Sequence, residues 1–109
     1  MLKSLYLYRI QPIRLEMLTT GSIPQEEQAA AEHFAYLQRL TQEGTVMLAG
    51  RTLDGAPDVF GMVLFWAESE AEARALMLAD PAVAQGVMRA DLHPFQVSLF
   101  NAAYFTMED

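Results

Sequence analysis

Four segments of the chain have the alternating or continuous apolar pattern of β-strands. The first alternates leucine with tyrosine in LYLY, and aromatic side chains of this kind are typical of a pleated sheet. The second and third are apolar runs separated by the turn-forming sequence DGAPD, so they predict an antiparallel hairpin. The fourth segment alternates apolar and polar residues less regularly, around FQVSL. The predicted strands cover residues 3–10, 45–53, 59–67 and 91–100.

A helix is predicted between the first two strands, after a long connection over residues 11–21. Ser22 and Gln25 have the spacing of a capping box, and Gly44 favours the left-handed conformation that ends a helix near Glu43. Apolar residues recur in this helix at three- and four-residue spacing, which predicts a face that packs against the sheet. This face is predicted to contain Ala30, His33, Phe34, Leu37 and Leu40.

A second helix is predicted between the third and fourth strands. Ser69 and Glu72 form another capping box at the start of an alanine-rich stretch. This helix is predicted to end before Asp80, because the residue before a proline is disfavoured in the helical region. Pro81 then opens one more helical turn over residues 82–87.

The resulting order is strand, helix, strand, strand, helix, strand, which predicts an α+β fold of the ferredoxin-like βαββαβ type. In this arrangement two helices pack on one face of a four-stranded antiparallel sheet. The third strand, VFGMVLFWA, is apolar on both faces, which is expected only where both faces are covered. The chain has no further helices to cover the second face, so we expect a second copy to cover it as a homodimer.

Composition narrows the class of protein. The 109 residues are enough for one domain, predicted to span residues 1–109. A net charge of −7 with scattered basic residues argues against nucleic-acid binding. The apolar runs are too short to span a membrane, and the N-terminal residues lack the features of a signal peptide, so we expect a cytoplasmic protein. The absence of cysteine excludes disulfides and thiolate chemistry.

Several segments, taken in order, resemble the YCII-related (YciI-like) family. They are EHFAYLQRL, the EG at 43–44, LAGRTLDG at 48–55, SEAEARALMLADPAVAQG at 69–86 and HPFQV in the fourth strand. The resemblance implies a dimeric α/β barrel, in which two ferredoxin-like subunits place their sheets face to face. It also implies an active-site pair formed by His33 and Asp80. The chain departs from the common pattern at Glu32 and at Arg51, where a proline often follows Ala-Gly.

An imidazole with a carboxylate suits general acid–base chemistry. The imidazole of a free histidine exchanges its proton near neutral pH. His33 is predicted to face the sheet, and Asp80 would orient its ring by accepting an N–H. Without a hydroxyl or thiol nucleophile, the pair favours proton transfer beside a carbonyl or phenol over acyl transfer. The alternatives are a core or interface histidine bonded to a backbone carbonyl, and an aspartate that only caps a helix.

Two further residues are predicted to contact a substrate. Arg51 can pair with a carboxylate or phenolate through its planar guanidinium, or can balance nearby acidic residues at the surface. Tyr8 is one of several aromatic residues that could line a pocket between the sheets, and its hydroxyl offers a polar tip. His93 is the only other histidine, and two histidines without an acidic motif predict no metal site. No cofactor motif is present.

Two functions fit these observations. The first is an enzyme that uses His33 and Asp80 on a small aromatic or carbonyl substrate. The second is a dimeric module that binds a small ligand or a protein without catalysis, and the absence of a strong catalytic motif favours it. A purely structural role in a larger assembly would require exposed apolar edges beyond one two-fold interface.

Overall fold

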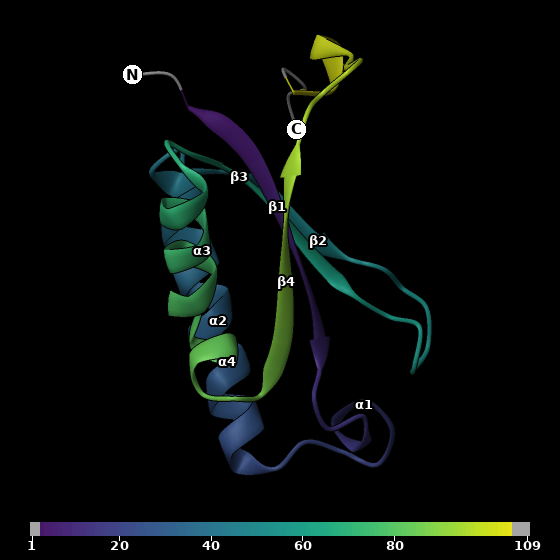
Figure 1. Ribbon diagram of the computed structural model, residues 1–109. Coiled ribbons are helices and arrows are strands. Elements are labelled where there is room, and N and C mark those ends of the chain that lie inside the picture. Colours follow the sequence, from purple (N-terminus) through teal and green to yellow (C-terminus); the bar gives the residue numbers. More distant parts are fainter. Residues whose placement is uncertain (1–2, 106–109) are drawn as a thin grey trace.

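The chain folds into one four-stranded sheet with its main helices on one side. The computed structural model describes residues 3–105. Figure 1 shows α2, α3 and α4 on the same side of the sheet. The elements in chain order are β1 (Ser4–Pro12), α1 (Glu16–Thr19), α2 (Pro24–Gln42), β2 (Val46–Arg51), β3 (Gly61–Ala67), α3 (Glu70–Ala79), α4 (Pro81–Ala84), β4 (Met88–Phe95) and the 3₁₀ turn η1 (Ala102–Phe105).

The strand order is β2-β3-β1-β4, and every neighbouring pair is antiparallel. This is the ferredoxin-like order, so the predicted fold class is confirmed. The hairpin of β2 and β3 was also predicted correctly, although both strands are shorter than their apolar runs. The two central strands, β1 and β3, carry most of the hydrophobic core between the sheet and the helices.

Alternation along β1 separates its two faces. Tyr6, Tyr8 and Ile10 point toward the helices and are buried there. The intervening residues, with their partners on β3 and β4, form the other side of the sheet, which no helix within residues 3–105 covers (Figure 1). We call this side the open face. It carries Leu5, Leu7, Arg9, Gln11, Met62, Leu64, Trp66, Arg89, Asp91, His93 and Phe95.

Helix α2 begins and turns differently from the prediction. Its N-cap is Ile23 and not Ser22, because Pro24 occupies the first helical position, where a missing N–H costs no hydrogen bond. The carboxylate of Glu26 accepts the Ile23 N–H at 2.9 Å, so the reciprocal contact of a capping box starts one residue later than predicted. The helix ends as expected before Gly44, which has φ +88°.

The buried face of α2 is also rotated from the predicted one. Leu37 and Leu40 are buried as expected, but the first half of the helix buries Glu26 and Ala29. Phe34 is 67% exposed, so its assignment to the packing face was wrong. The small Ala29 is fully buried, as is Ala82 of the neighbouring α4, and alanines let two helices approach closely.

The second helical region follows the sequence closely. The Ser69 hydroxyl accepts the Glu72 N–H at 3.1 Å, as the capping box predicts. Helix α3 ends at Ala79, and Asp80 leaves the helical region with ψ 123° before Pro81. The extra turn, α4, starts at Pro81 itself and is shorter than the predicted 82–87.

The fourth strand is displaced toward the N-terminus relative to the prediction of 91–100. It runs over Met88–Phe95, and its first residues pair with the end of β1. The register places Leu5 opposite Phe95, and only one residue of β1, Ser4, precedes Leu5. Residues 96–100 therefore have almost no strand to pair with, although their apolar pattern is that of a strand. They run away from the helices beyond the end of β4 (Figure 1).

The connection after β1 is tied to the start of α2. The guanidinium of Arg14 makes two hydrogen bonds of 2.7 Å with the two carboxylate oxygens of Glu26. This bidentate pair lowers the pKa of Glu26 to about 2, mainly through the bond from Arg14 and then through the Ile23 N–H. The connection between β1 and α1 is thereby joined to the first turn of α2.

None of the helices within residues 3–105 has the length and the apolar character needed to cross a membrane.

Candidate functional site

His33 and Asp80 are in direct contact although 47 positions separate them. The Nδ1 atom of His33, on α2, lies 2.8 Å from each carboxylate oxygen of Asp80, which lies between α3 and α4. The contact forms because α2 packs against α4 next to the point where Pro81 ends α3. The structure therefore brings together the two residues that the resemblance to YCII-related proteins paired.

Asp80 is a fully buried carboxylate with several donors. Besides the His33 ring, its Oδ1 accepts the Ala82 N–H at 3.0 Å and its Oδ2 accepts the Tyr8 hydroxyl at 2.6 Å. The Ala82 bond makes Asp80 the N-cap of α4. Burying a charged carboxylate is costly unless it is paired and hydrogen-bonded, and these three donors supply that compensation. Asp80 therefore caps helix α4 and also contacts His33.

Tyr8 lies on the helix side of the sheet and not between sheets, where it was expected to line a pocket. Its ring is fully buried and packs edge-on against Phe65, with ring centres 5.7 Å apart. Burial, followed by the nearby charge and hydrogen bond of Asp80, raises the pKa of Tyr8 well above its ordinary value. Tyr8 therefore stays protonated and donates its hydroxyl to Asp80.

The second ring nitrogen of His33, Nε2, reaches the surface. The side chain is 18% exposed, and the described residues offer Nε2 no hydrogen-bond partner. Among those same residues, every buried side-chain nitrogen or oxygen has a partner, so Nε2 is not buried. With Nδ1–H donated to Asp80, the Nε2 lone pair is available to an incoming proton.

Tyr36 is a further polar side chain close to this cluster, and it was not singled out from the sequence. It lies one helical turn after His33, and its hydroxyl donates to the Leu76 carbonyl of α3 at 2.8 Å. Burial and then the charge of Asp80 raise the pKa of Tyr36. Its spacing of three residues from His33 was the signal in the sequence that places both on one helix face.

Arg51 lies at the end of β2, as predicted, and its side chain is exposed. Within residues 3–105 the Arg51 side chain forms no hydrogen bond or ion pair, either with Asp54 and Asp58 or with the His33 cluster. The structure does not bring Arg51 together with the other three candidate residues. Its predicted contact with a substrate remains a prediction.

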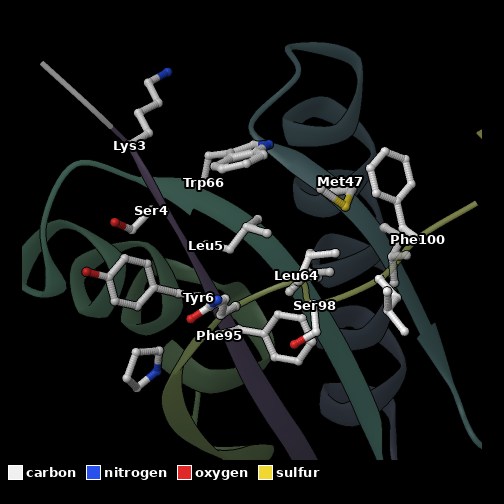
Figure 2. Close-up of a pocket in the computed structure, with 15 residues that line it drawn as sticks. Lys3, Ser4, Leu5, Tyr6, Met47, Leu64, Trp66, Phe95, Ser98 and Phe100 are labelled. Atoms are coloured by element: carbon white, nitrogen blue, oxygen red, sulfur yellow. The ribbon is translucent and has the colours of Figure 1, made fainter. Parts of the chain in front are cut away.

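A wide hollow lies on the open face. It has a volume of about 1340 Å³ and lies between the sheet and residues 96–100. Figure 2 shows Leu5, Leu64 and Trp66 on the sheet side of this hollow, with Phe95 and Phe100 from β4 and the segment after it. The His33 cluster is on the opposite side of the sheet, where Tyr8 points. The chain therefore has an apolar hollow and a polar cluster separated by the thickness of the sheet.

The part of the chain that the structure describes holds no group of three histidine, cysteine, aspartate or glutamate side chains arranged to bind a metal ion.

These features define a ferredoxin-like α+β protein with a carboxylate–imidazole pair beside its sheet. The chain belongs to the YCII-related family, whose domain matches residues 9–96. The match includes β1 from Arg9 onward, all of α2 and the Asp80–Pro81 junction, so it covers both His33 and Asp80. No protein of curated function matches this sequence.

Two solved structures share the fold at low sequence identity. One is 5-chloro-2-hydroxyhydroquinone dehydrochlorinase from Burkholderia phenoliruptrix, in complex with 2,5-dihydroxybenzoquinone. It has 20% identity and a TM-score of 0.63, over 84% of this chain and 93% of that chain. The other is an uncharacterised protein from Thermotoga maritima, with 12% identity and a TM-score of 0.54, over 87% of this chain and 100% of that chain. At these sequence identities the likeness shows a shared fold only.

Proposed function

We propose that this protein is an enzyme that transfers a proton to and from a small substrate, with His33 as the general acid–base and Asp80 as the residue that orients it. The observation that carries the proposal is the 2.8 Å contact of His33 Nδ1 with a fully buried carboxylate, together with an Nε2 that reaches the surface. A histidine that only filled the core would bury both ring nitrogens or bond them to backbone carbonyls.

In this mechanism Asp80 accepts the Nδ1–H, which leaves the lone pair on Nε2. Nε2 takes a proton from the substrate, and the resulting imidazolium is stabilised by the carboxylate beside it. The same proton returns to the substrate, to a leaving group or to water in the second half of the reaction. Tyr8 contributes by holding Asp80 in place, because its hydroxyl is buried and donates its hydrogen bond to the Asp80 carboxylate.

The substrate class we propose is a small oxygenated ring with an acidic proton beside a carbonyl or phenol. Proton removal from such a compound gives an enolate or phenolate, which can isomerise or expel a leaving group. The solved dehydrochlorinase with the same fold carries out a reaction that formally removes HCl, in which a proton and a chloride ion leave the substrate. Halogenated hydroxyhydroquinones are therefore the first compounds to test.

We further propose that two copies associate through their open faces as a homodimer, and that the protein is cytoplasmic. Trp66 and Phe95 lie on this face and are 36% and 42% exposed, next to the 1340 Å³ hollow. Large apolar side chains gathered at one surface favour association, and a two-fold interface uses the same surface on both copies. The closure of two such sheets would form a dimeric α/β barrel.

The function is tested by incubating the protein with a panel of chlorinated and unchlorinated hydroxyhydroquinones in D₂O. Chloride release and deuterium incorporation are measured together, since either would report a proton-transfer step. His33→Gln is expected to lower the rate by about 100-fold or more, the usual contribution of a general acid–base. Asp80→Asn is expected to lower it as well, through loss of the imidazole orientation.

The matched control is Gln38→Ala, an exposed position on the same helix as His33. It should leave the rate unchanged. Circular dichroism and thermal unfolding establish whether each variant is folded. A folded His33→Gln variant that keeps the wild-type rate on a turned-over substrate would contradict the proposal.

A further inference from the structure

The open face has a second, polar half that the proposed reaction does not use. Here Gln11 of β1 lies opposite Arg89 of β4, and Arg9 lies opposite Asp91. A hollow of about 250 Å³ is lined by these four residues and Ala90. Because Tyr8 points to the helices, its neighbour Arg9 points away from the His33 cluster. The polar hollow is thus on the other side of the sheet from the candidate active site.

Each guanidinium group of this hollow contacts a neutral partner. The guanidinium carbon of Arg9 lies 5.4 Å from the centre of the Phe60 ring, a cation–π distance. The Arg89 Nη2 atom donates to the Gln11 side-chain oxygen at 2.7 Å. Neither contact neutralises the positive charge, although both restrict where the guanidinium lies. Within the described residues Arg89 has no ion-pair partner, and Arg9 has only the 3.8 Å ion pair with Asp91.

The one carboxylate of the hollow, Asp91, is shared between His93 and Arg9. Asp91 Oδ2 lies 2.9 Å from the His93 Nε2 atom, whereas Asp91 Oδ1 forms a longer ion pair with Arg9, 3.8 Å from its Nε and beyond hydrogen-bond distance. By contrast, Arg14 makes two bonds of 2.7 Å to its glutamate partner. In a chain with net charge −7, two arginines lining a hollow with a single aspartate are a local excess of positive charge.

We propose that this hollow is a binding site for a small carboxylate that bears a hydroxyl group. The guanidinium groups of Arg9 and Arg89 present planar N–H donors, which match the two oxygens of a carboxylate. Asp91 accepts the hydroxyl through the oxygen that His93 leaves free, and it disfavours a second anionic group at that position. The hollow, about 250 Å³, accommodates a molecule of this size.

The site does not depend on the proposed catalytic role of His33. A second copy placed on the open face would enclose the hollow, and an enclosed guanidinium without an anion is costly. The competing arrangement is a reciprocal ion pair, in which Arg9 of each copy bonds Asp91 of the other. In that case no small anion is needed, and the experiment separates the two.

The probe is sodium glycolate, titrated into ¹⁵N-labelled protein against sodium chloride at the same ionic strength. Saturable shifts of the backbone amides of β1 and β4 around the hollow are expected with glycolate. Arg9→Gln and Arg89→Gln are each expected to weaken binding by at least about tenfold, the scale of a charge-assisted hydrogen bond. The matched control is Arg74→Gln on α3, which removes the same charge far from the hollow and should bind glycolate as the wild type does.

Several results would overturn the proposal. Shifts that do not saturate with glycolate would mean general charge screening. The same holds if Arg74→Gln weakens the shifts as much as Arg9→Gln and Arg89→Gln do. Tighter binding of inorganic phosphate than of glycolate would overturn the carboxylate class. A loss of self-association in both Arg9→Gln and Asp91→Asn, without glycolate binding to the wild type, would establish the reciprocal ion pair instead. If either glutamine variant is unfolded, Arg89→Lys is used instead. It keeps the positive charge but removes the planar N–H donors of the guanidinium, so weaker glycolate binding is still expected.

Discussion

The Tyr8 hydroxyl donates a 2.6 Å hydrogen bond to Asp80, a residue 72 positions away. This bond joins the central strand β1 to the junction of α3 and α4, and His33 adds α2 to the same carboxylate. Three parts of the fold thus converge on one buried charge. The hydrogen bonds that compensate the burial of Asp80 also hold in place the carboxylate that would orient the His33 ring. Stability and the proposed chemistry therefore depend on the same contacts.

Tyr8→Phe should destabilise the fold at neutral pH, because Asp80 loses one of its donors while remaining buried. Removing a partner of a buried charged group costs about 1–3 kcal/mol. The aromatic ring is kept, so no cavity contributes to the loss. The free energy of unfolding, measured with urea, gives the effect. Tyr6→Phe is the control, since within the described residues the Tyr6 hydroxyl makes no hydrogen bond, and a change as large as that of Tyr8→Phe would contradict the assignment.

Glu26→Gln should make the protein less sensitive to acid. Arg14 and the Ile23 N–H lower the pKa of Glu26 from 4.5 to about 2. The unfolded chain therefore binds this proton near pH 4.5, whereas the folded chain binds it only near pH 2. The stability that the carboxylate contributes is complete above pH 4.5 and is lost as the pH falls toward 2.

The measurement is urea unfolding at several values between pH 7 and pH 2. The Glu26→Gln variant should be less stable than wild type at pH 7, and the difference should shrink toward pH 2. Glu27→Gln, at the exposed neighbouring position, should follow the wild-type profile. A constant difference across the range would mean that the ion pair with Arg14 is not its source.

Diethyl pyrocarbonate should acylate His33 at Nε2, because this atom reaches the surface while Nδ1 is held by Asp80. Asp80→Asn should slow that modification, since the carboxylate no longer fixes the Nδ1–H tautomer or supports positive charge on the ring. Peptide mass spectrometry separates the two histidines of the chain. His93 serves as the internal reference, and a slowing at both histidines would point to a general change in the protein.

Trp66→Glu should convert the proposed dimer to a monomer, because it places a charge within the apolar half of the open face. Sedimentation velocity at several concentrations measures the change. Leu78→Glu on α3 introduces the same charge at an exposed leucine on the helical side and should leave the association intact. A wild-type protein that sediments as a monomer at every concentration would contradict the dimer.

The sequence by itself determined most of the local structure. The Ser69 capping box, the end of α2 at Gly44 and the break at Asp80–Pro81 depend on interactions within a few residues, and all three were predicted correctly. The element order followed from them and predicted the ferredoxin-like sheet. The pairing of His33 with Asp80 came from the resemblance to a family, since no local pattern connects α2 with that junction.

Only the tertiary structure decided which side of the sheet each residue faces. Alternation separates Tyr8 from Leu7, but both are apolar enough to be buried, so periodicity cannot tell which of them meets the helices. The same limit applies to Phe34, which lies next to the buried face of α2 and is exposed because the closely packed Ala29 sets the rotation of the helix. The position of β4 was decided by the start of β1, a partner more than eighty residues away. Tyr8 was therefore found at Asp80 on the helix side, and the open face was left to Trp66 and Arg9.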